Sequence, residues 1–251
     1  MGKLIINADD FGYGKGVNMG IIEAYQNGVL TSTTLMAGMP GFDQAVKLAK
    51  DNPGLGVGVH LTLTCGYPAS KGLKTIVDDE GAFLNLSFYE KKDNLNLINL
   101  DEVYKEWKAQ IDKVIDSGIN PTHIDSHHHI NSVGELKKIY LRLADEYSLP
   151  VRNNFNLPEG YKSTSKMMDY FDHIGSNKEI WRHMDTNNLI RDCKIYDSIE
   201  IMCHPAYVDS FLVENSSYTL GRTSTLKELL SPEIKKLLED NEIELVTFRD
   251  I

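Results

Sequence analysis

A cluster of histidines around one carboxylate gives the first indication of chemistry in this sequence. Four of the eight histidines lie within the seven residues from His123 to His129. If this stretch is an extended strand, alternation of side chains puts His123, Asp125, His127 and His129 on one face, with isoleucines on the other. Such a face belongs either to a solvated edge strand or to a site where imidazoles and a carboxylate converge on a metal ion. The density of these residues favours the metal site.

The rest of the chain alternates between two hydrophobic patterns. Short apolar runs predict strands, and apolar residues at three- and four-residue steps predict helices. Together with the histidine segment, strands are expected over 3–8, 30–37, 55–63, 150–153, 198–203 and 244–248. Helices are expected over 16–27, 42–50, 100–117, 133–147, 178–190 and 231–240. About seven strands separated by helices predict a parallel α/β fold, and the absence of a composition break predicts one domain over 1–251.

Polar residues follow the predicted strands at the points where they end. In parallel α/β proteins, whether barrels or open sheets, sites form at the carboxyl ends of the strands, so residues far apart in sequence can converge there. Two imidazoles and one carboxylate would leave coordination positions open for water and substrate, as catalytic metal sites do. The residues at these strand ends are Asp9, Asp10, His60, His127, Arg152 and His204.

Each of these residues also has a structural interpretation. Asp9 and Asp10 are followed by Gly12 and suit an Asx turn or a helix cap. His60 on an apolar strand could be a core histidine with satisfied hydrogen bonds. His204 before a proline could cap its strand, and Arg152 could form a surface ion pair. The coincidence of all of them with strand ends is the argument for a site.

One long section, 64–99, shows no periodicity and carries turn signals at 66–68 and 78–81. A connection of this length without secondary structure is usually functional, so we expect it to cover the site.

Composition narrows the classes of partner and location. The net charge of −10 and the lack of long Lys/Arg runs argue against nucleic acid. The three cysteines Cys65, Cys193 and Cys203 show no CxxC spacing, which favours a reducing cytoplasm over a disulfide framework. The first residues contain too short an apolar run for a signal peptide, and no stretch approaches the ~18 apolar residues of a membrane span. A cytoplasmic protein without membrane contact is expected.

Four strings of residues carry the polar positions named above, and they are Ile6–Gly12, Gly58–Leu63, Thr122–His129 and Met202–Ala206. In order and spacing these strings resemble the YdjC-like carbohydrate deacetylases, which include the chitooligosaccharide deacetylases. The resemblance spans nearly the whole chain. It implies a distorted, incomplete (β/α) barrel, a divalent ion often taken to be magnesium, frequent homodimers, and hydrolysis of an N-acetyl group on a sugar.

The resemblance also implies a set of metal ligands. Carried over by position, His60 and His127 are similar to the two histidine ligands of the family, and Asp10 to the carboxylate ligand. The family implies Mg²⁺, whereas two nitrogens and one oxygen suit Zn²⁺, Co²⁺ or Mn²⁺ by ligand preference. The histidine run of the family often continues to a position where this chain has Asn131, a departure that leaves the ligand set unchanged.

The same resemblance implies roles in amide hydrolysis. Asp9 resembles the general base that takes a proton from the attacking water, and His204 resembles the acid that protonates the leaving amine. Arg152, if it reaches Asp9, would hold that carboxylate ionised and oriented. The expected substrate is therefore a small acetylated sugar. Two alternatives stay open: a hydrolase of another amide or ester on the same barrel, and a sugar-binding or regulatory protein without turnover.

Overall fold

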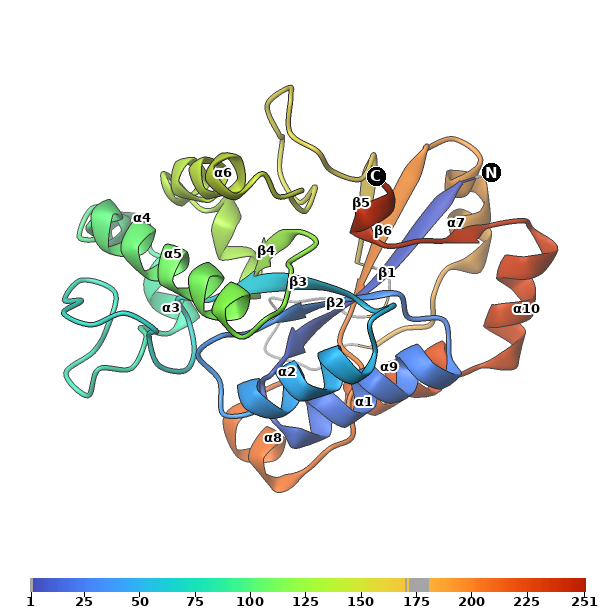
Figure 1. Ribbon diagram of the computed structural model, residues 1–251, viewed down its shortest axis with the longest axis horizontal. Helices are drawn as coiled ribbons and strands as arrows, with labels where there is room; N and C mark the ends of the chain where they lie inside the picture. The colour runs from blue at the N-terminus through green and yellow to red at the C-terminus, as the bar shows by residue number, and fades with distance from the viewer. Residues whose placement is uncertain (1, 170, 172–180) are drawn as a thin grey trace.

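The computed structural model describes residues 2–169, 171 and 181–251 of the chain, and its centre is one parallel sheet. The sheet has seven strands in the order β4-β3-β2-β1-β6-β5, with β7 paired to the start of β1. It curls into a half-barrel (Figure 1), which confirms the predicted fold class. The strands are β1 (Lys3–Phe11), β2 (Ser32–Leu35), β3 (Gly56–Leu61), β4 (Ile124–Ser126), β5 (Lys166–Met168), β6 (Ser198–Cys203) and β7 (Glu244–Leu245).

Helices surround this sheet, with α1, α2, α8 and α9 along one side of it and α5 and α6 beyond β3 and β4 (Figure 1). In α1, residues Val17, Ile21 and Ala24 are buried at steps of four and three residues. The helices are α1 (Lys15–Asn27), α2 (Phe42–Asp51), α3 (Leu86–Tyr89), α4 (Lys92–Leu95), α5 (Leu100–Asp116), α6 (Leu136–Tyr147), α7 (Thr186–Cys193), α8 (Ser210–Asn215), α9 (Leu220–Leu229) and α10 (Pro232–Asp240).

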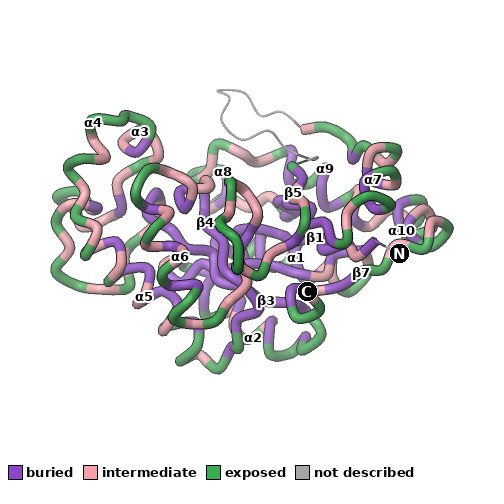
Figure 2. Tube along the Cα trace, turned by 90° about the horizontal axis from the view of Figure 1, so that it is seen from above, coloured by how far each residue is buried: buried purple, intermediate pink, exposed green. Residues whose placement is uncertain are grey.

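The four longest strands of the sheet are buried along almost their whole length. Every residue of β2, β3 and β6 is buried, as is all of β1 except Lys3. Figure 2 shows the same pattern, with buried strands at the centre and exposed positions on the outer helices. Polar side chains on these strands have therefore lost contact with water, and they need partners inside the protein.

Several predicted elements have different bounds in the structure. The extended histidine segment is wrong beyond Ser126, because the chain turns there into a 3₁₀ helix, His127–Ser132. Residues 150–153 form a single bridge, Val151 to Ile124, and the last predicted strand gives way to a 3₁₀ helix at Phe248–Asp250. The helix predicted over 178–190 begins outside the described residues. Residues 181–185 are not helical, and α7 runs from Thr186 to Cys193. Sequence patterns missed β5, α8 and α9, and they missed the short helices α3 and α4 in the section 64–99.

Helix α5 holds the section 64–99 in place with two glutamates. Buried Glu106 accepts hydrogen bonds from the Ala69 and Ser70 amides, both at 2.8 Å, and from the Ser70 hydroxyl at 2.6 Å. One turn earlier, half-buried Glu102 binds the Lys74 and Thr75 amides in the same manner. Figure 1 shows most of the section beside α5, so it is a packed flank of that helix. Its role as a cover over the site stays a prediction.

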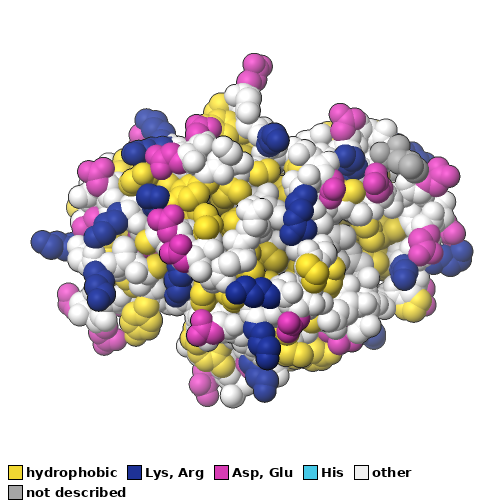
Figure 3. Space-filling model, viewed as in Figure 1, with side chains coloured by type: hydrophobic (Ala, Val, Ile, Leu, Met, Phe, Trp, Pro, Cys, Tyr) yellow, Lys and Arg dark blue, Asp and Glu magenta, His cyan; other side chains and the backbone are white. Residues whose placement is uncertain are grey.

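The surface drawn in Figure 3 carries Lys and Arg singly or in small groups among Asp and Glu. No helix in the described part of the chain is long and apolar enough to cross a membrane. The prediction that the protein does not bind nucleic acid stays a prediction.

Replacement of Glu106 by glutamine tests the link between α5 and the section 64–99. The amide of Gln would turn a donor toward groups that already donate, and a buried donor left without an acceptor costs about 1–3 kcal/mol. We expect Glu106→Gln to lower the free energy of unfolding by that amount in urea titrations followed by tryptophan fluorescence. Glu102→Gln is the matched control, and because water can reach that position its loss should stay below about 1 kcal/mol. Equal losses in the two variants would contradict this account.

Candidate functional site

An irregularity in β1 places the two adjacent aspartates in the same site. In a regular strand Asp9 and Asp10 would point to opposite faces of the sheet. The pairing register of β1 with β2 shifts between Ala8 and Phe11, and Asp10 has the left-handed φ of 71°. Asp tolerates this conformation better than most residues do. The bulge therefore brings both carboxylates into the buried space at the carboxyl ends of the strands.

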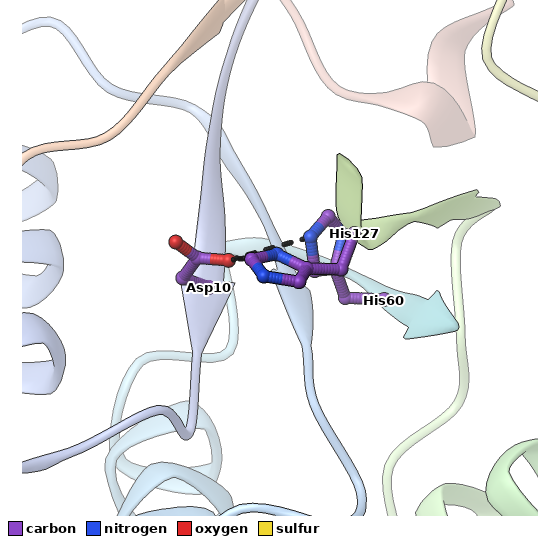
Figure 4. Close-up of side chains that lie close together, drawn as sticks. All are labelled: Asp10, His60 and His127. Atoms are coloured by element: carbon purple, nitrogen blue, oxygen red, sulfur yellow. Dashed lines mark ion pairs between the residues drawn. The ribbon is translucent and has the colours of Figure 1, made fainter. Parts of the chain in front are cut away.

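Asp10, His60 and His127 converge at this point (Figure 4). The Asp10 Oδ1 atom lies 2.9 Å from Nδ1 of His127 and 3.4 Å from Nε2 of His60. Asp10 Oδ1 and His60 Nε2 are buried and have no hydrogen-bond partner among the described residues. Buried polar atoms are rarely left in this state, so the arrangement fits a cation between the three side chains. They are the three residues for which the family resemblance implied metal binding, and they form one group that could hold a metal ion.

His60 is held in the orientation that such a site requires. Its Nδ1 atom lies 2.6 Å from Oδ1 of Asp125, and the Thr34 hydroxyl donates to the other oxygen of that carboxylate at 3.1 Å. An Nδ1–H donated to Asp125 leaves the Nε2 lone pair directed at Asp10. Metal-binding histidines are commonly oriented by a carboxylate in this manner.

The buried charges of the site also fit a divalent cation. When all its carboxylates are ionised, they outnumber the guanidiniums by two. Without such an ion, the raised pKa values of His60 and His127 favour protons on these rings, which would supply positive charge instead. Burial alone would lower the pKa of His60, but Asp125 and Asp9 raise it to about 9. The charged groups are Asp9, Asp10, Asp125, Glu200, Arg152 and Arg222.

Asp9 pairs with Arg152, as predicted. The two guanidinium nitrogens of Arg152 each donate to one Asp9 oxygen at 2.7 Å, and Arg152 Nε donates to Glu200 at 2.8 Å. Burial alone would raise the pKa of Asp9, but Arg152, with smaller effects from His60 and His204, lowers it well below its usual range. Asp9 is therefore ionised at neutral pH and fixed in direction by two parallel hydrogen bonds.

His204 follows β6 and is buried. Its ring packs edge-on to Tyr218, with 6.1 Å between the ring centroids. It lies close enough to Asp9 to act on the pKa of that carboxyl. The strand ends thus bring together all six residues that the sequence predicted.

The structure adds partners that the sequence analysis missed. Arg222 on α9 donates to Oδ2 of Asp10 at 2.8 Å, and Glu200 on β6 accepts from Arg152. Glu200 had a signal in the sequence, because it is a charged residue in the middle of an apolar strand. Arg222 had none, since its helix was not predicted.

Not every residue of the histidine cluster joins the three candidate ligands. His123 stacks on Phe248 with 3.7 Å between ring centroids, so it is a buried packing residue. His128 and His129 have left-handed φ angles of 55° and 52°, and the alternation expected for a strand does not apply to them. The structure therefore places His127 in the candidate group, but in a 3₁₀ helix and not in the extended strand that the sequence predicted.

The comparisons with known proteins agree with this fold and site. The YdjC-like protein family model matches residues 3–240, so the chain belongs to this family. A protein of Clostridium beijerinckii named carbohydrate deacetylase is 41% identical over 253 residues, which cover 99% of this chain and 100% of that protein. A protein of Brevibacillus brevis with the same name is 42% identical over 254 residues, covering 99% of each chain. The predicted family is confirmed.

A solved structure from Enterococcus faecalis is also similar along the whole chain. It is described as a proposed cellobiose-phosphate cleavage protein and is 34% identical, with a TM-score of 0.84. The match covers 99% of this chain and 98% of that one. The half-barrel is thus the fold of a solved relative.

Three variants test whether Asp10, His60 and His127 hold a metal ion. We expect the wild-type protein to bind about one divalent ion per chain in calorimetric titrations with Mg²⁺, Mn²⁺, Co²⁺ and Zn²⁺. Loss of the carboxylate behind a histidine ligand typically costs 10- to 100-fold in affinity, so Asp125→Asn should fall in that range. His127→Gln, which removes a ligand, should lose about 100-fold or more. His128→Gln is the neighbouring control and should bind as the wild type does. Equal affinities in all three variants would exclude this site.

The buried carboxyl of Glu200 predicts a pH effect on stability. Burial raises its pKa to about 7 against the opposing effect of Arg152. Between pH ~4.5 and ~7 the folded state therefore binds more protons here than the unfolded state, so this group lowers the free energy of unfolding as pH rises, by on the order of 2 kcal/mol. Urea titrations of metal-free protein give the free energy of unfolding at each pH in this range. The difference in this free energy between the wild type and Glu200→Gln should change with pH as described. A pH-independent difference would contradict it.

Proposed function

We propose that this protein is a metal-dependent hydrolase that removes the N-acetyl group from an acetylated amino sugar or chito-oligosaccharide. The observation that carries the proposal is the difference between the two adjacent aspartates. Asp9 is tied to Arg152, whereas Asp10 faces two imidazoles with one oxygen unpaired. One carboxylate is thus ionised and fixed in position, and the other is open to a cation. The names of the curated relatives support the choice of an acetylated sugar.

In this proposal Asp10, His60 and His127 hold one divalent ion, Mg²⁺ by the family resemblance, with Zn²⁺, Co²⁺ or Mn²⁺ as alternatives. When bound, such an ion would polarise the acetamide carbonyl and lower the pKa of a water molecule. The unpaired Asp10 oxygen and His60 nitrogen support this assignment.

Asp9 and His204 move the protons of the reaction. Asp9 accepts a proton from the attacking water as the water oxygen bonds to the acetyl carbon. His204 protonates the amine nitrogen as the C–N bond breaks. Acetate and the free amino sugar are the products. With so low a pKa Asp9 is a weak base, so its contribution rests on position and charge. Arg152 supplies both by fixing the direction of the carboxylate and keeping it ionised.

A second class of substrate comes from the solved relative, which is described as a proposed cellobiose-phosphate cleavage protein. A phosphorylated disaccharide is therefore worth testing beside the N-acetylated sugars. A regulatory sugar-binding protein is the alternative without turnover, and it would need neither a base nor an acid. The single domain, the cytoplasmic location and the homodimer expected from sequence stay predictions.

Acetate release from N,N′-diacetylchitobiose and longer chito-oligomers tests the proposed reaction. We expect metal-stripped protein to be inactive and a single added metal to restore release. Loss of a positioned acid or base typically costs 10²- to 10⁴-fold in rate, so kcat should fall by about that factor in Asp9→Asn and in His204→Asn. Both variants should still bind the metal, as calorimetry would show.

The controls separate the alternatives. Asp43→Asn, a substitution at an exposed position of α2, should release acetate at the wild-type rate. Cleavage of cellobiose phosphate without acetate release would move the assignment to the second substrate class. Sugar binding without turnover, unchanged in Asp9→Asn, would favour the regulatory protein.

A further inference from the structure

A chain of hydrogen bonds with a fixed direction runs through the turn that follows β4. The backbone amide of Asn131 donates to the Ser126 hydroxyl oxygen at 2.9 Å, and that hydroxyl donates to Oδ1 of Asn131 at 2.8 Å. A side-chain amide has one oxygen that accepts and one nitrogen that donates. Because Ser126 gives its proton to Asn131, the accepting side of this amide is identified and its nitrogen must donate elsewhere.

The direction continues from Asn131 to a histidine. Asn131 Nδ2 donates to Oδ1 of Asn154 at 3.0 Å, so the Asn154 nitrogen is left as a donor. That nitrogen lies 3.0 Å from Nδ1 of His129. His129 Nδ1 must therefore accept, and a neutral imidazole that accepts at Nδ1 carries its proton on Nε2. Ser126, Asn131 and Asn154 thus determine which ring nitrogen of His129 carries the proton.

His129 lies where its Nε2–H can meet a ligand. Its ring is half-buried, and no hydrogen bond from the described residues reaches Nε2. Nor is that atom among the buried unpaired ones. His129 follows His127 by two residues, and its partner Asn154 follows Arg152 by two residues, so the ring lies beside the group formed by His127, Asp10, Arg152 and Asp9. The site therefore has a hydrogen-bond donor, His129 Nε2–H, whose direction is fixed by Asn154 on the other ring nitrogen.

We propose that His129 binds the substrate by donating a hydrogen bond from Nε2 to an oxygen of the sugar, with Asn154 and Asn131 as positioning residues. The acceptor is either a sugar hydroxyl or the acetamide oxygen, because both accept such a bond. The choice of a sugar rests on the proposed function, whereas the tautomer rests on the hydrogen bonds alone.

The tautomer is measured first, by NMR of protein labelled with ¹⁵N in its histidines. The His129 signals are identified as those missing in His129→Gln. We expect a protonated Nε2 and an unprotonated Nδ1 in the wild type. Asn154→Asp replaces the donor by an acceptor, so Nδ1 should become protonated. Asn153→Asp introduces the same charge one residue away, where the amide donates to the Thr164 carbonyl, and it should leave Nδ1 unprotonated. A protonated Nδ1 in the wild type would overturn the inference.

Kinetics then test the contact with substrate. One neutral hydrogen bond corresponds to about three- to tenfold in affinity. We expect His129→Leu to lower kcat/KM by about that factor with metal content unchanged, and His129→Gln, whose amide can donate from a similar position, to stay within about twofold of wild type. A rise in KM alone assigns the bond to a hydroxyl, and a fall in kcat assigns it to the acetamide oxygen. Unchanged kcat/KM in His129→Leu would overturn the contact.

Failure of the proposed function can be distinguished from failure of this inference. Metal-loaded Asp9→Asn protein is titrated with N,N′-diacetylchitobiose while the His129 Nε2 signal is followed. If the sugar shifts this signal but the wild-type protein releases no acetate, the His129 contact is supported and the deacetylase is overturned. If the wild-type protein releases acetate but the sugar shifts no signal in Asp9→Asn, the deacetylase is supported and the His129 contact is overturned.

Discussion

The buried guanidinium of Arg152 connects three strands of the sheet. It donates to Asp9 on β1 and to Glu200 on β6, and it lies 2.8 Å from Asp125 on β4. Buried carboxylates need compensating charge and hydrogen bonds, and a planar group with five donors can supply several of them at once. The contacts that hold these strands together also fix Asp9, while Asp125 orients His60. The fold and the candidate site therefore depend on the same guanidinium group.

The bulge in β1 gives the neighbouring residues Asp9 and Asp10 different partners. Both aspartates are buried on the same side, but Asp9 receives two hydrogen bonds from one guanidinium and Asp10 receives one from Arg222. The second Asp10 oxygen is left toward His60 and His127. A left-handed φ at a non-glycine residue costs on the order of 1–3 kcal/mol, and it persists only where surrounding contacts determine it. Here those contacts are the ones that distinguish the two carboxylates.

The sequence predicts the parallel fold because alternating strands and helices leave a periodic signal, and it predicts Asp10 and His60 because they lie near the carboxyl ends of apolar strands. Its failures have physical causes. Arg222 reaches Asp10 across 212 positions from a helix with no clear apolar stripe. The end of β4 was misplaced because the turn after Ser126 uses left-handed histidines, where glycine or asparagine would have indicated a turn. Long-range pairing and uncommon backbone angles leave no pattern in neighbouring residues.

The partners of each ring nitrogen, rather than the spacing of the histidines, decide what each residue of the cluster can do. His127 faces the unpaired Asp10 oxygen and can bind a cation. His123 is stacked on an aromatic ring in the core. The Nδ1 atoms of His128 and His129 are occupied by the hydroxyl of a threonine and the amide of an asparagine. A ring with one nitrogen bound to the protein can present only the other to a ligand. The density of imidazoles in the sequence therefore overstates the number of candidate metal ligands. The surrounding hydrogen bonds fix the directions of the other ring nitrogens.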